Sequence, residues 1–139
     1  MKPSHRHRAR KLLVQALYEI HIAKNPWSEV LNNTLANNLE TKFDREYLVL
    51  SFKGLEANLD EIDDLINEGI TRKFQDINPV ELSILRLGCY ELKHRHDVPS
   101  KVAINEALEL SKLFGSEDGY KFVNGVMDKL LKLHPEFNR

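Results

Sequence analysis

The most apolar part of this protein begins with the sequence Asn78-Pro79-Val80-Glu81-Leu82-Ser83-Ile84-Leu85-Arg86-Leu87-Gly88-Cys89-Tyr90-Glu91-Leu92. Its first four residues are typical of a helix start. Asparagine caps the helix, proline suits the first helical position, and glutamate follows three residues after the cap. The residues that follow are apolar on almost every side of the predicted helix, which is typical of a buried helix. Pro99 requires the helix to end before it, so we expect this segment to form the central helix of the fold.

Apolar residues recur at helical spacing on both sides of this segment, and no alternation typical of a strand is found. The chain also shows no repeat, low-complexity tract or linker. We therefore predict one all-α domain over residues 1–139, with about seven helices. Four further helices are predicted before this segment: one around Leu13–Ile20, one after Pro26, one after the capping residue Asp44, and one from about Leu59 to about Gly69. Two more are predicted after it, over Lys101–Leu113 and over Glu117–Leu133.

The composition is that of an ordinary globular protein, with 139 residues, 42% hydrophobic and 29% charged. This length is sufficient for a core without disulfides or metal. Cys89 is the single cysteine and lies in the most apolar segment, so we predict that it belongs to the core and that no internal disulfide forms. No apolar run reaches the length of a membrane span, and no signal peptide is recognisable. These features favour a cytoplasmic protein.

Positive charge is concentrated at the N-terminus. The net charge of the chain is −1, yet residues 1–18 carry +5 and residues 19–139 therefore carry −6. We interpret residues 1–12 as a basic arm that leads into the first helix and binds phosphate, because lysine and arginine release counterions when they meet a nucleic acid backbone. The basic residues are Lys2, Arg6, Arg8, Arg10 and Lys11.

A helical wheel of the first helix separates a core side from a basic side. Arg8, Lys11, Gln15 and Tyr18 fall together on the side opposite the apolar residues. Basic groups neutralise phosphate and a tyrosine ring can stack on an unpaired base, so this face is a candidate RNA-binding surface. The alternative is a solvated helix start with a partly buried tyrosine. Basic residues at a helix N-terminus oppose the helix dipole, which favours the functional interpretation.

The last predicted helix carries a second candidate aromatic. Phe122 lies outside the apolar stripe of this helix, among Asp118, Lys121, Gly125 and Lys129. An exposed phenylalanine beside lysine and glycine is suited to stacking on a base. The alternative, that Phe122 bridges to another helix, stays open at this point.

Other patterns offer weaker candidates. Residues 56–68 are rich in acids, which are typical of a solvated face but also of a surface for a basic protein. The pairs His5/His7 and His94/His96 have the wrong spacing for a metal on one helical face, and no cysteine cluster accompanies them. The glycines form no phosphate loop, and no catalytic triad or carboxylate pair stands out. We therefore expect a binding protein without metal or cofactor rather than an enzyme.

Several motifs together carry a resemblance that covers the whole chain. They resemble the signature of the NusB family of bacterial transcription antitermination factors. The C-terminal ones are the most specific, and residues 19–77 match loosely. The motifs are Arg8-Ala9-Arg10, Val14-Gln15-Ala16-Leu17-Tyr18, Leu85-Arg86-Leu87-Gly88-Cys89-Tyr90-Glu91-Leu92, Asp97-Val98-Pro99-Ser100-Lys101-Val102-Ala103-Ile104-Asn105-Glu106-Ala107 and Phe114-Gly115-Ser116-Glu117-Asp118-Gly119-Tyr120-Lys121-Phe122-Val123-Asn124-Gly125-Val126-Met127-Asp128.

The resemblance implies two packed helical bundles and a heterodimer with small-subunit ribosomal protein ten, called NusE in this role. It implies binding of single-stranded boxA RNA in ribosomal RNA operon transcripts, together with other Nus factors and RNA polymerase. A homodimer is a further expectation for the chain when that partner is absent. Glu81 matches a family position that we expect to contact the ribosomal protein. The residues expected to bind RNA are Lys2, Arg6, Arg8, Arg10, Lys11, Gln15, Tyr18, Lys101, Asp118, Lys121, Phe122 and Asn124.

Two competing hypotheses remain. The first is a protein-only helical scaffold that uses the acidic residues 56–68 for a basic partner. The second is an enzyme subunit, because NusB-like domains also occur fused to ribosomal RNA cytosine methyltransferase domains. The chain has no glycine-rich cofactor site, so we expect no methyltransferase activity.

Overall fold

The central helix forms where the sequence predicts it. In the computed structural model, which describes residues 2–139, α5 spans Pro79–His94. The Asn78 side chain caps the helix by accepting a hydrogen bond from the Val80 backbone N–H at 2.9 Å, and Pro79 occupies the first turn. Every residue from Leu82 to Leu92 is buried, which confirms the predicted central position of this helix.

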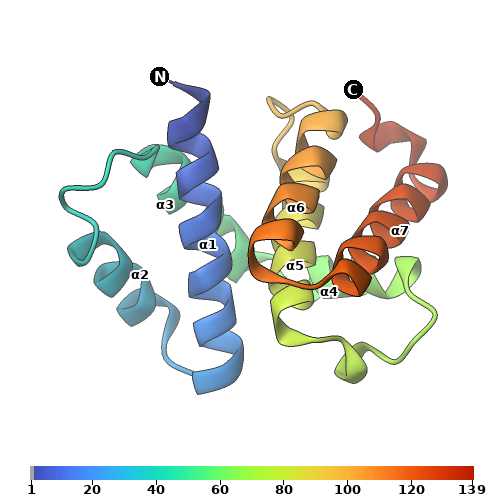
Figure 1. Cartoon of the computed structure of the whole chain (residues 1–139), viewed down its shortest axis with the longest axis horizontal. Coiled ribbons are helices and arrows are strands. Elements are labelled where there is room, and N and C mark those ends of the chain that lie inside the picture. The colour runs from blue at the N-terminus through green and yellow to red at the C-terminus, as the bar shows by residue number, and fades with distance from the viewer. Residues whose placement is uncertain (1) are drawn as a thin grey trace.

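Within residues 2–139 the chain contains seven α-helices, two short 3-10 helices and no strand, which confirms the predicted all-α fold. The elements are α1 (Pro3–Ala23), α2 (Trp27–Ala36), α3 (Arg45–Ala57), α4 (Leu59–Gly69), η1 (Phe74–Asp76), α5, α6 (Ser100–Phe114), α7 (Glu117–Leu133) and η2 (Pro135–Phe137). We call α1, α2 and α3 the N-terminal bundle and α4, α6 and α7 the C-terminal bundle, and α5 contacts helices of both (Figure 1).

The basic segment near the N-terminus is helical, which corrects the picture of an arm that precedes the first helix. α1 already begins at Pro3, and Lys2 is its extended N-cap residue. The start of α1 is held against the start of α3, because the Asp44 backbone N–H donates to the His5 carbonyl at 3.0 Å. The basic side chains are therefore presented on a fixed helical surface.

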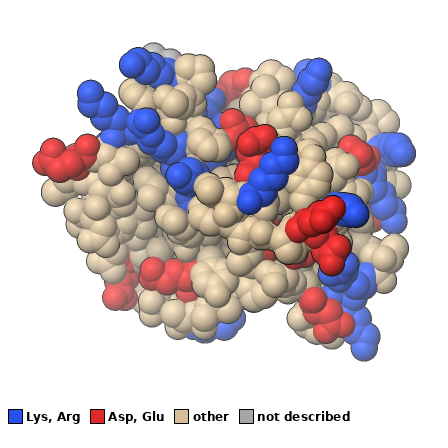
Figure 2. Space-filling model, viewed as in Figure 1, with Lys and Arg blue, Asp and Glu red and all other residues tan. Residues whose placement is uncertain are grey.

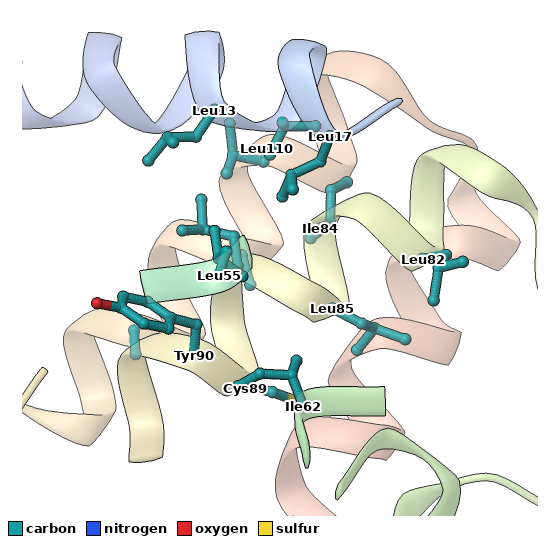
Figure 3. Close-up of a cluster of buried hydrophobic side chains, with 14 of the residues drawn as sticks. Leu13, Leu17, Leu55, Ile62, Leu82, Ile84, Leu85, Cys89, Tyr90 and Leu110 are labelled. Atoms are coloured by element: carbon teal, nitrogen blue, oxygen red, sulfur yellow. The ribbon is translucent and has the colours of Figure 1, made fainter. Parts of the chain in front are cut away.

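The core joins side chains from both bundles around α5. Figure 3 shows Leu17 of α1 near Ile84 and Leu13 farther along α1 beside Leu110 of α6, while Leu55 and Ile62 come from α3 and α4. Cys89 is fully buried in this core, as predicted, and burial raises the pKa of its thiol above the ordinary value. A reactive thiolate at this position is therefore disfavoured.

The acidic residues of α4 are partly used inside the molecule. The Asp63 carboxylate accepts two hydrogen bonds from the Arg86 guanidinium, both at 2.9 Å, and Glu61 pairs with Lys93 and His94.

None of the helices within residues 2–139 has the length and apolar character needed to cross a membrane.

The end of α7 is tied to α4 through a histidine. His134 Nε2 lies 2.9 Å from Glu68 Oε1, and His134 Nδ1 lies 2.9 Å from Glu136 Oε1. The hydrogen bond to Glu68, followed by that to Glu136, raises the pKa of His134 above its ordinary value of 6.5. The protonated ring thus joins the C-terminal segment to α4.

We predict that this contact stabilises the protein only at low pH. A raised pKa in the folded state adds stability that is complete below the unfolded pKa of about 6.5 and is lost as the pH rises through the folded pKa. His134→Gln should therefore lower the melting temperature at about pH 5.5 and leave it nearly unchanged at about pH 8.5. His96→Gln, at an exposed histidine, is the control. Equal effects of His134→Gln at both pH values would contradict the prediction.

Candidate nucleic-acid interface

One exposed face of α1 carries basic, amide and aromatic side chains in succession. Arg8, Gln15 and Tyr18 are exposed and Lys11 is half-exposed. The Arg8 guanidinium donates to the Lys42 carbonyl at 2.9 Å but stays accessible. Figure 2 shows lysine and arginine side chains gathered over the upper part of α1, whereas the surface below them carries uncharged and acidic side chains. These side chains lie on one surface, as the helical wheel predicts.

Arg10 does not lie on this surface, which corrects its assignment to the RNA-binding arm. Its side chain is 3% exposed and its guanidinium donates to the Glu91 carboxylate, with Nη2 2.9 Å from Oε2. Arg10 is buried because of its place on the helix. It lies three residues before Leu13 and seven before Leu17, so it shares the core face of α1.

The Arg10–Glu91 pair is the centre of a buried polar cluster between the two bundles. Tyr47 of α3 donates its hydroxyl to Glu91 at 2.8 Å, and Glu106 of α6 lies 3.5 Å from Arg10. Burial is the largest single influence and lowers the pKa of Arg10, but Glu91, Tyr47 and Glu106 together outweigh it, so the net pKa is raised and the guanidinium stays charged. Arg10 therefore has a structural role in this fold.

Arg6 is also largely engaged inside the molecule. Its guanidinium lies 3.4 Å from Asp44, 3.3 Å from Asp97 and 4.7 Å from the centre of the Tyr47 ring. It lies four residues before Arg10 and therefore on the same side of α1. Arg6 is therefore half-exposed but paired, whereas Lys2, Arg8 and Lys11 of the predicted arm form no ion pair within residues 2–139.

Lys2 and Lys101 belong to the opposite end of the molecule from Tyr18. Lys2 and Arg6 line a groove of about 320 Å³ with Pro99 and Val102, which come just before and within the first turn of α6. Lys101 is exposed between these two residues. The structure therefore places Lys101 near the basic start of α1.

The second predicted group lies at the start of α7. The Ser116 side chain caps this helix by accepting a hydrogen bond from the Gly119 backbone N–H at 3.0 Å. Asp118 and Lys121 are exposed on the first turns, and Asn124 is half-exposed. Asp118 lies one turn before Phe122 on the same side of α7, whereas Asn124 follows Phe122 by two residues and therefore lies on another side of the helix.

Phe122 is half-buried, so its ring combines the two predicted alternatives: one part packs on the core and another part stays accessible. It packs partly against the core, and the Arg72 guanidinium lies over its ring at 3.9 Å from the centroid. Arg72 is exposed, and sequence reasoning missed it. The available signal was the basic pair Arg72-Lys73 in the segment before α5, but its distance in sequence from Phe122 hid the contact.

Glu81 lies beside this group. A Cβ atom added to Gly119 would lie 2.8 Å from Glu81 Oε2, so glycine allows the first turns of α5 and α7 to approach closely. Burial, together with the nearby Asp118 carboxylate, raises the pKa of Glu81, and Arg72 acts in the opposite direction. Glu81 therefore belongs to the Phe122 end of the surface.

The two predicted groups are joined by a small pocket. It has a volume of about 220 Å³ and lies between α1, the start of α5 and the end of α6. Gln15 and Tyr18 line one side, and Val80, which precedes Glu81, lines another. We refer to the whole surface, from Arg8 through this pocket to Phe122 and Arg72, as the α1–α7 strip.

Within residues 2–139, no group of three or more histidine, cysteine, aspartate or glutamate side chains is arranged to hold a metal ion. The chemistry that the strip offers is neutralisation of phosphate, stacking of aromatic rings and hydrogen bonding by amides.

Comparison with known proteins gives a consistent result. The chain matches the NusB family over residues 7–132. It is 47% identical to the transcription antitermination protein NusB of Colwellia psychrerythraea over 133 residues, which cover 96% of each chain. It is 46% identical to the protein of the same name from Pseudoalteromonas translucida, with 95% of this chain and 97% of the relative covered.

Solved structures share the fold. The structure of T. maritima NusB has a TM-score of 0.82 and 31% identity, and covers 92% of this chain and 91% of its own. A crystal structure of the antitermination factors NusB and NusE in complex with double-stranded RNA has a TM-score of 0.85 and 23% identity. It covers 96% of this chain and 100% of the matched one.

Proposed function

The chain belongs to the NusB family, and from this premise we propose that it acts in transcription antitermination as one half of an RNA-binding heterodimer. The partner is small-subunit ribosomal protein ten (NusE), and the ligand is the single-stranded boxA element of ribosomal RNA operon transcripts. The pair joins other Nus factors on RNA polymerase and helps the polymerase to resist termination. The protein works in the cytoplasm by binding and not by catalysis.

The observation that carries this proposal is the order of side chains along the exposed face of α1. Arg8 and Lys11 come first and supply positive charge, and Gln15 and Tyr18 follow one and two turns later. A single-stranded RNA presents phosphates and unstacked bases together, so charge followed by an amide and an aromatic matches its chemistry.

The start of α7 extends the same chemistry. Phe122 offers an aromatic ring, Arg72 offers a planar cation over it, and the exposed Asp118 and Lys121 lie on the same first turns of α7. A guanidinium plane stacks on bases as well as on aromatic rings. In the proposed complex, RNA runs along the α1–α7 strip, and the ribosomal protein completes the binding surface.

The test is binding of labelled boxA RNA and a scrambled RNA, with and without ribosomal protein ten, over a range of salt concentrations. We expect selective binding that the partner strengthens. Arg8→Ala/Lys11→Ala should reduce the steepness of log K against log salt by roughly 1.4, because each phosphate contact on a single strand contributes about 0.7.

The matched control is Lys53→Ala/Lys132→Ala, which removes two exposed lysines from α3 and from the last turn of α7. This variant should keep the slope of the unmodified protein. An unchanged slope in Arg8→Ala/Lys11→Ala would exclude these residues as phosphate contacts. Equal affinity for boxA and scrambled RNA, with and without the partner, would leave the protein-only scaffold as the better explanation.

A further inference from the structure

The side chain of Arg139 lies against the end of α5. Its guanidinium donates to the backbone carbonyls of Glu91 and Leu92 in the last turns of the helix, at 2.8 and 2.9 Å. It also donates to the carbonyl of Arg95, which follows the helix, at 2.6 Å. The end of a helix leaves carbonyls without partners inside the helix, and arginine is one of the side chains that can satisfy them. Arg139 therefore caps the end of α5.

The backbone of Arg139 is bonded to the beginning of the next helix. The Ser100 N–H donates to the Arg139 backbone oxygen at 3.1 Å, and Ser100 Oγ lies 3.3 Å from the same oxygen and from the Arg139 nitrogen. Ser100 is the first residue of α6, and Figure 1 shows the end of the chain beside this first turn. One residue thus holds the end of α5 and the start of α6 together.

The segment that carries Arg139 is itself anchored in the fold. Phe137 is buried in the core, and the His134 ring stacks on it with the ring centroids 4.9 Å apart. The Arg139 guanidinium also donates to the Phe137 carbonyl at 3.2 Å. Arg139 as a whole is exposed, yet these contacts hold its guanidinium in one place.

The connection between α5 and α6 carries charged groups that belong to the basic end of the molecule. Asp97 accepts two hydrogen bonds from the Arg95 guanidinium, at 3.0 and 2.9 Å, and one from Arg6 of α1 at 3.3 Å. Lys101, a predicted RNA contact, is the second residue of α6, is exposed, and forms no ion pair within residues 2–139. Because a lysine is a point charge on a flexible stem, the place where its helix begins decides which phosphate it reaches.

We propose that Arg139 is a positioning residue for RNA binding. By joining the end of α5 to the start of α6, it sets the place of Lys101 beside the basic start of α1, and it does not itself contact RNA. The inference rests on the proposed RNA-binding function. It assigns a role to a residue that lies outside every motif of the sequence analysis and beyond the family match, which ends at residue 132.

The first measurement needs no RNA. Arg139→Met removes the four side-chain hydrogen bonds and keeps an unbranched side chain. We expect amide hydrogen exchange over residues 97–103 to become about fivefold faster or more, the effect of losing one ordinary hydrogen bond, while exchange in the middle of α1 and α3 stays unchanged.

Two further variants make the exchange result specific. Arg139→Lys keeps a charged donor near the carbonyls and should restore part of the protection. Asn138→Met, at the exposed neighbour, is the matched control and should leave exchange over residues 97–103 as it is in the unmodified protein. Unchanged exchange in Arg139→Met would overturn the inference. Melting temperatures show whether each variant is folded.

The second measurement asks whether Lys101 depends on Arg139 when boxA RNA binds in the presence of ribosomal protein ten. In the unmodified protein, Lys101→Ala should reduce the steepness of log K against log salt by about 0.7, the contribution of one phosphate contact on a single strand. In the Arg139→Met background, the same substitution should reduce it by less than about half of this amount, because a displaced lysine no longer makes the full contact.

The control for this coupling is Arg8→Ala/Lys11→Ala, which should reduce the slope by roughly 1.4 in both backgrounds. A uniform loss of RNA binding in Arg139→Met would instead weaken both effects alike, and would overturn a specific role toward Lys101.

The outcomes separate the positioning role from the wider function. If Lys101→Ala has the same effect on the slope in both backgrounds, or no effect in the unmodified protein, the inference is overturned and the proposed function stands. Equal affinity of the unmodified protein for boxA and scrambled RNA would overturn the proposed function, and the positioning role with it.

Discussion

Arg10→Met should destabilise the protein by about 3–5 kcal/mol, the cost typical of removing one partner from a buried ion pair. Glu91 is 1% exposed. After the substitution its carboxylate stays in the interior, and the Tyr47 hydroxyl of α3 is its remaining hydrogen-bond donor. The loss is readable as a fall in the free energy of unfolding in urea.

Two variants make this expectation specific. Arg8→Met removes the same side chain from an exposed position of the same helix and should change stability by no more than about 0.5 kcal/mol. Arg10→Met/Glu91→Met removes both charges and should recover most of the loss. If this double variant binds RNA like the unmodified protein, Arg10 is not a phosphate contact. A loss below about 1 kcal/mol in Arg10→Met would contradict the structural role.

Tyr18→Ala/Phe122→Ala should weaken binding of boxA RNA by roughly thirtyfold or more, because each base stacked on an aromatic ring contributes about 1–3 kcal/mol. The two rings lie on different helices of the α1–α7 strip, and Arg72 covers one face of Phe122. The measurement is the affinity for boxA RNA in the presence of ribosomal protein ten.

The dependence on salt distinguishes stacking from charge. The double aromatic variant removes no charge, so its plot of log K against log salt should keep the slope of the unmodified protein. Tyr120→Ala, at a half-buried aromatic of α7 whose ring lies near Lys112, is the control and should bind normally. Unchanged affinity in Tyr18→Ala/Phe122→Ala would show that bases do not stack on this strip.

The sequence predicted the helices well where local signals were strong. The predicted start of α5 at Asn78-Pro79 and the predicted span of α7, Glu117–Leu133, agree with the structure. Both helices have a capping side chain at the start, and each is followed by a proline. Such signals act within a few residues and so are visible in a single sequence.

The errors arose where the decisive partner is distant in sequence. Arg10 was counted with its basic neighbours, yet Glu91, an acid inside the most apolar helix, required a buried cation. Arg72 was overlooked because Phe122 follows it by fifty positions. Periodicity assigns a face to a side chain, but it does not reveal which distant side chain that face meets.

The helical start of α1 has a thermodynamic consequence for RNA binding. Fixing the backbone of a disordered segment costs about 1–2 kcal/mol per residue, and a segment that folds on binding must meet this cost from its contacts. Here the start of α1 is already held by the Asp44–His5 backbone hydrogen bond and by Arg6. The free energy of phosphate contacts at Arg8 and Lys11 is therefore available for affinity, and association proceeds without the heat-capacity change of coupled folding.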